Sequence, residues 1–74
     1  MSPDKLARMA NQIAKFFNAR PHGEAVSGIA GHLSDFWEPR MRRQFFELME
    51  TDPDLFEPLV RDAAGKVRPV AGMQ

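Results

Sequence analysis

Apolar residues recur at intervals of three and four along most of this chain, which places them on one side of a helix. The first run lies between Pro3 and Pro21, and its apolar residues are Leu6, Met9, Ala10, Ile13, Phe16 and Phe17. Ser2, Pro3 and Asp4 are typical of a helix start, because serine caps, proline suits the first position and aspartate favours the positive end. We therefore predict a first helix that ends before Pro21, since the residue preceding a proline avoids helical geometry.

The second run predicts a helix from Glu24 to Trp37 with the apolar residues Val26, Ile29, Ala30, Leu33, Phe36 and Trp37. Its opposite side is made mostly of small residues, namely Ser27, Gly28, Gly31 and Ser34, together with Asp35. Each interior glycine costs a helix about 1 kcal/mol relative to alanine. Two interpretations stay open: a helix that tolerates this weakness, or a side on which a neighbouring chain approaches the backbone closely.

The remaining residues predict one more long helix and one short helix. A third helix from Pro39 to Glu50 has a narrow core face of Met41, Phe45 and Leu48, which Phe46 and Met49 widen toward either the core or a partner. Pro58 inside a helix would cost about 3 kcal/mol, so we predict a turn over residues 53–56. A final helix then runs from Glu57 or Pro58 to Ala64, and Gly65 suits its end.

These elements predict an all-α fold, a small bundle of three main helices plus one short C-terminal helix. Residues 1–64 form a single helical domain, and residues 65–74 are expected to form a flexible C-terminal tail without an apolar pattern. The 74 residues make one domain at most, and a chain of this length is marginally stable alone. It has no cysteine for a disulfide or a thiolate zinc site, so stability must come from packing, self-association or a partner.

Composition narrows the classes of function. Ten basic and ten acidic residues give a net charge of zero, which argues against a general nucleic-acid binder and favours association. Six phenylalanines, five methionines and one tryptophan are many for so small a core, so we expect apolar area to remain for another chain. No apolar run approaches the ~20 residues needed to span a bilayer, and no secretory signal is visible, so we expect a cytoplasmic protein without membrane contact.

The residue types of common active sites are scarce. The chain has no cysteine or tyrosine and no glycine-rich phosphate loop. His22 and His32 are ten residues apart, which does not place both on one helical side as a metal site would need. We therefore predict no catalytic, cofactor-binding or metal-ligating residue.

The most distinctive segment joins the second and third predicted helices. It contains the only tryptophan, a helix-breaking proline and two arginines, and we predict that it binds a partner through Phe36, Trp37, Glu38, Pro39, Arg40, Met41 and Arg42. Arginine and tryptophan are enriched among the residues that dominate binding energy at interfaces. Other interpretations stay open: both aromatics as core residues, local ion pairs of Glu38 with Arg42 and of Arg43 with Glu47, or contact of the arginines with phosphate.

Three segments together resemble one protein family. They are residues 6–17, which contain Met9-Ala10-Asn11-Gln12, residues 36–42, and residues 55–64. Their order is similar to that in the small delta subunit of the soluble, NAD-dependent, molybdenum-containing formate dehydrogenases, over roughly residues 6–64. Glu38 stands where the resemblance leads us to expect aspartate, and residues 65–74 match no part of the pattern.

The resemblance implies a non-catalytic accessory subunit that stabilises or helps to assemble a formate dehydrogenase. The parent complex oxidises formate to carbon dioxide and passes the electrons to NAD. Its molybdenum-pterin cofactor, iron-sulfur clusters and FMN belong to the larger subunits, so this chain is expected to bind no cofactor.

The implied partners are those larger subunits, the catalytic one favoured, with a homodimer possible in isolation. Two alternatives stay open from the residues themselves. One is a DNA-binding or regulatory module whose third helix reads DNA through Arg40, Arg42 and Arg43. The other is a self-associating helical protein.

Overall fold

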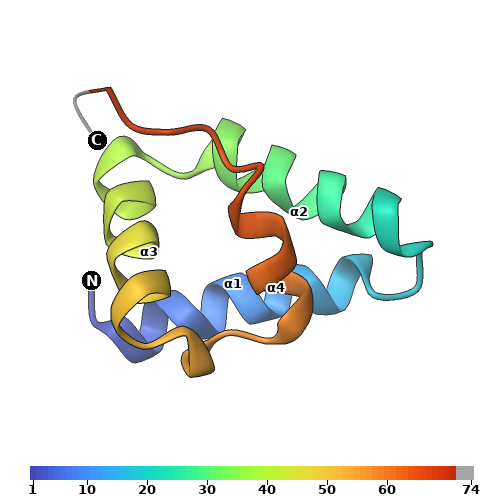
Figure 1. Ribbon diagram of the computed structural model, residues 1–74, viewed down its shortest axis with the longest axis horizontal. Coiled ribbons are helices and arrows are strands. Elements are labelled where there is room, and N and C mark those ends of the chain that lie inside the picture. Colours follow the sequence, from blue (N-terminus) through green and yellow to red (C-terminus); the bar gives the residue numbers. More distant parts are fainter. Residues whose placement is uncertain (72–74) are drawn as a thin grey trace.

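The computed structural model describes residues 1–71, and within them all regular structure is helical (Figure 1). The elements are α1 (Pro3–Phe17), α2 (His22–Phe36), α3 (Pro39–Thr51), the short 3-10 helix η1 (Pro53–Leu55) and α4 (Pro58–Ala64). The predicted all-α bundle of three longer helices and one short C-terminal helix is confirmed.

Prolines set most of the element boundaries. Pro3, Pro39, Pro53 and Pro58 each open a helix, where the missing backbone N–H costs nothing. The hydroxyl of Ser2 caps α1 by accepting from the backbone N–H of Lys5 at 3.2 Å. The predicted boundaries differ from the observed ones at the α1–α2 turn, because α1 already ends at Phe17 and α2 begins at His22, directly after Pro21.

The helices close around one shared core. In Figure 1, α1 and α2 meet at the turn between them and diverge from there, while α3 lies across their other ends. The short helix α4 lies between α1 and α2 and contacts both, with its most extensive contact on α2. The fully buried larger side chains come from all four helices and the α3–α4 connection, and they are Leu6, Ile29, Leu33, Phe45, Phe56 and Val60.

The predicted apolar faces are mostly buried, with two corrections at the helix ends. Phe16 and Phe36 were both expected on apolar faces, yet 70% and 73% of their surface is exposed. The buried residues of α1 are Leu6, Ala7, Ala10 and Ala14, whereas Met9, Ile13 and Phe17 of the predicted face are half-buried. Phe36 is the last residue of α2, and Trp37 takes the inner position after it.

The expected C-terminal tail is corrected over its first part. Val67 and Val70 are buried, so the compact unit extends beyond residue 64 to Val70. The backbone N–H of Arg68 donates to the hydroxyl of Ser34 on α2 at 2.8 Å, which fixes this segment to the bundle. Two valines three residues apart among glycine, lysine, arginine and proline show no sustained helical or strand period, so the sequence pattern did not reveal them. Residues 72–74 of the predicted tail lie outside the described residues.

Candidate partner-binding site at the junction of α2 and α3

The predicted binding segment forms a sharp junction in which only Trp37 and Glu38 lie outside a helix. Both have extended backbone geometry, and Pro39 opens α3 immediately after them. This geometry sends neighbouring aromatic side chains in opposite directions. Phe36 is 73% exposed, whereas Trp37 is 6% exposed and lies edge to face against Phe45, with ring centres 6.0 Å apart. Trp37 is therefore a core residue, as one of the two interpretations of the sequence held.

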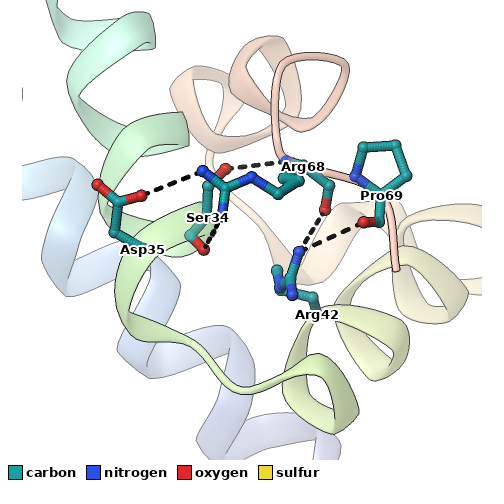
Figure 2. A network of polar contacts seen from close by, with 5 residues as sticks. All are labelled: Ser34, Asp35, Arg42, Arg68 and Pro69. Atoms are coloured by element: carbon teal, nitrogen blue, oxygen red, sulfur yellow. Dashed lines mark hydrogen bonds and ion pairs between the residues drawn. The ribbon is translucent and has the colours of Figure 1, made fainter. Parts of the chain in front are cut away.

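Arg42 also points inward, although it is charged. Only 8% of its surface is exposed, and its Nη1 donates to the backbone carbonyl oxygens of Arg68 at 2.8 Å and Pro69 at 3.4 Å (Figure 2). Its Nε is buried without a hydrogen-bond partner among residues 1–71. Within residues 1–71 neither the Glu38–Arg42 pair nor the Arg43–Glu47 pair, which the sequence left open, forms. Arg42 instead fastens the C-terminal segment to α3.

A second arginine, Arg68 of the C-terminal segment, binds this segment to α2 as well. The guanidinium of Arg68 reaches the end of α2, where Nη1 donates to the Ser34 carbonyl at 3.4 Å and Nη2 pairs with Asp35 at 3.3 Å (Figure 2). The pair of Arg68 with Asp35 is largely exposed, and such pairs contribute only about 0–1 kcal/mol. The buried contacts of Arg42 hold the C-terminal segment to α3, and the bond from the Arg68 backbone N–H to the Ser34 hydroxyl holds it to α2, so the surface pair adds little.

Asn11, from the Met-Ala-Asn-Gln segment, fastens another irregular stretch. Its side-chain NH₂ donates to the carbonyl of Leu55 at 3.0 Å, and its side-chain oxygen accepts from the backbone N–H of Glu57 at 2.9 Å. The amide thereby pairs backbone groups between η1 and α4 that no helix satisfies. Arg61 adds a donor to the carbonyl of Phe56 at 2.6 Å. Sequence reasoning missed this role, for which the only signal was an asparagine inside a helix, where it is disfavoured.

The seven predicted site residues therefore separate into two groups. Phe36, Glu38, Pro39 and Arg40 are exposed, Met41 is half-buried, and Trp37 and Arg42 are buried within the chain itself. We call the four exposed residues the outer junction. A DNA reader built on α3 would lose Arg42, whose side chain is already bonded inside the protein.

Other chemistry-bearing residues do not gather into a site. Within residues 1–71 no group of three His, Cys, Asp or Glu side chains is placed to hold a metal ion. His22 pairs with Asp62 at 3.4 Å, and the ring of His32 lies against Phe36 at 4.9 Å. Phe46 and Met49 are partly buried against the core and line an open groove with Val67 and Pro69. No helix in the described part of the chain is both long and apolar enough to cross a membrane.

The fold and the junction together define a small all-helical bundle. Asn11, Trp37 and Arg42 hold segments of the chain itself in place. Phe36, Glu38 and Arg40 remain at the surface. Comparison with known protein families is more specific: residues 5–64 match the delta subunit (FdsD) of NADH-dependent formate dehydrogenase, and the chain belongs to this family. The family resemblance seen in the sequence is thereby confirmed. Comparisons with curated proteins and with solved structures gave no significant match.

Proposed function

We propose that this chain is a non-catalytic accessory subunit that stabilises or helps to assemble an NAD-dependent formate dehydrogenase complex. The family match over residues 5–64 is the observation that carries this proposal, because it spans the chain from the first turn of α1 to the end of α4. The family description names a subunit of an enzyme. The partners of this chain are therefore the larger subunits of that enzyme, the catalytic subunit first among them, and its place of action is the cytoplasm.

The residue inventory supports an accessory role. The parent reaction, as the family resemblance implies it, uses a molybdenum-pterin, iron-sulfur clusters, FMN and NAD. Iron-sulfur clusters are held by cysteine thiolates, and this chain has no cysteine. The residues of this chain therefore do not fit a cluster, and we assign all four cofactors to the larger subunits.

The outer junction is our first candidate for contact with those subunits. Phe36 and Arg40 are exposed there, and both residue types are suited to interfaces, one as an apolar anchor and the other as a planar cation. Trp37 and Arg42 support the same contact indirectly, since they fix the shape of the junction from inside. This divides the predicted binding segment into a part that touches the partner and a part that positions it.

The direct test is to produce the larger subunits with and without this chain and to compare the yield of intact complex and its formate-dependent NAD reduction. We expect the complex formed without the chain to be less stable, with a shorter active lifetime on storage or dilution. The tagged chain should co-purify with the larger subunits in fixed stoichiometry. A complex of unchanged yield, activity and lifetime, or a chain that purifies alone, would refute the accessory role.

Arg40→Glu tests the outer junction within that experiment. The side chain is exposed, so the reversal should leave the fold intact and weaken co-purification, with the circular dichroism spectrum as the check on folding. Arg8→Glu on α1 is a matched reversal at another exposed arginine outside the junction. Equal retention of Arg40→Glu and wild type would remove Arg40 from the contact.

A further inference from the structure

An aromatic strip runs along the outer side of α1 and α2. The ring of Phe17 covers Gly28 so closely that a Cβ atom at that glycine would overlap it. His32 and Phe36 follow Gly28 at steps of four residues, which places all three along one side of α2. We define the aromatic strip as Phe16, Phe17, Arg20, Gly28, His32 and Phe36.

The exposure of Phe16 and Phe36 has no explanation within residues 1–71. Phe16 and Phe36 are the two most exposed of its large apolar residues within the described part of the chain. Phe16 also lies edge to face against Phe17, with ring centres 5.1 Å apart, so the exposed ring is held in place rather than isolated. Together the two exposed rings present roughly 250–300 Å² of apolar surface at the two ends of the strip.

Arg20 gives one end of the strip a charge. Its guanidinium lies over the rings of Phe16 and Phe17, 5.9 and 5.3 Å from their centres. Within residues 1–71 no carboxylate lies close enough to pair with it. A surface complementary to the strip must therefore be apolar along its length and acidic where it meets Arg20.

We propose that the aromatic strip binds a larger subunit of the formate dehydrogenase complex, in an apolar depression of that subunit with a carboxylate at its rim. This inference rests on the proposed function, because the accessory role supplies the partner. Phe36 belongs both to the strip and to the outer junction, so the two surfaces are continuous. The strip extends the contact from the junction along α2 to the end of α1.

A second copy of this chain is the competing occupant of the strip, and the family match to a subunit of an enzyme favours a larger subunit instead. In a two-fold pair a strip would meet its own copy, and the exposed carboxylates beside Phe36, Asp35 and Glu38, lie at the end of the strip opposite to Arg20. Asp35, beside Phe36, is already paired with Arg68 at 3.3 Å. A stable interface also buries about 800 Å² on each partner, far more than the two rings expose. The strip alone is therefore too small, and its partner must cover the adjoining outer junction as well.

Gly31 offers an independent probe of close approach. It lies beside the strip on α2, and a Cβ atom placed on it would have no other atom within 4 Å. Gly31→Gln therefore leaves the fold intact, yet its side chain would project next to Gly28 and His32. A partner seated on the strip should be pushed away by it.

The experiment measures the affinity of purified variants for the larger subunits, assembled without this chain. We expect the double variant F16Q/F36Q to bind at least about tenfold more weakly than wild type. Arg20→Glu and Gly31→Gln should each weaken binding as well. The double variant F16L/F36L retains apolar contacts and should lose less, and Glu47→Lys on α3 is a charge reversal away from the strip that should bind normally. Circular dichroism confirms the fold of each.

The outcomes separate this inference from the proposed function. If wild-type chain fails to bind the larger subunits, the accessory role itself is wrong. If wild type binds and F16Q/F36Q, Arg20→Glu and Gly31→Gln bind equally well, only the strip is wrong. If the strip variants abolish a dimer of the isolated chain in sedimentation but leave binding to the larger subunits unchanged, the strip serves a second copy and our assignment is overturned.

Discussion

The inner and outer sides of α2 contain similar residues with opposite environments. Trp37 is 6% exposed against Phe45, whereas its neighbour Phe36 is 73% exposed. The outer side itself is uneven, because Gly28 is covered by the ring of Phe17, whereas Gly31, one turn further along, faces open space. On the inner side each residue has a contact within the chain that explains it. On the outer side Phe16 and Phe36 contact neighbouring side chains yet remain largely exposed, and we look for the partner there.

The largest expected difference between the two sides concerns the two neighbouring aromatics. Trp37→Ala leaves a cavity beside Phe45 and should destabilise the fold by about 3–5 kcal/mol. The whole stability of a chain of this length is about 4–11 kcal/mol, so the substitution should remove a large share of it. Phe36→Ala, at an exposed site, should change stability by at most about 0.5 kcal/mol. Urea denaturation followed by circular dichroism measures both, and similar losses for the two variants would contradict the division into sides.

An intermediate effect is expected at the neighbouring arginines of α3. Arg42→Ala removes the donor to the carbonyls of Arg68 and Pro69 and should cost about 1–3 kcal/mol. Hydrogen exchange at Val67 and Val70 should accelerate, because the C-terminal segment loses its buried anchor. Arg43→Ala is the matched control, since that side chain is exposed. Unchanged exchange in Arg42→Ala would show that the valines hold the segment unaided.

The smallest expected effect distinguishes the two glycines. Gly31→Ala should stabilise the isolated chain by up to about 1 kcal/mol, because alanine favours the helix and meets no neighbour. Gly28→Ala should bring no such gain, because its methyl group overlaps the Phe17 ring and must displace it. Thermal unfolding of the two variants decides the point, and an equal rise in melting temperature would mean that Phe17 moves aside without cost.

The sequence predicted the helices well because prolines and apolar spacing are local signals. The bounds predicted for the last helix match α4, and the break before Pro39 lies at the observed junction. The periodicity of α2 also identified Val26, Ile29, Ala30 and Leu33 as buried, and all four are. It could not tell that Phe36 faces outward, because a residue at the end of a helix has a neighbour only if the next element supplies one.

The contacts between distant segments could not be predicted in the same way. The side chain of Asn11 meets residues 44 and 46 positions away, and Arg42 meets residues 26 and 27 positions away. No local period signals a side chain that pairs with a distant backbone group. For the same reason the sequence could not show that Trp37 and Arg42, the most unusual residues of the predicted binding segment, are buried within the chain itself.

The anchor formed by Arg42 also has a consequence for synthesis of the protein. Its acceptors lie at Arg68 and Pro69, so α3 leaves the ribosome well before the groups that complete its surroundings. Until then a guanidinium that is almost fully buried in the finished fold must stay hydrated, and the sites of Val67 and Val70 stay open. Residues 65–70 therefore close the fold late, although they lie outside the segment that defines the family. A nascent chain that has reached only the end of α4 is an incomplete bundle, and apolar surface that the finished protein covers is then open to other chains.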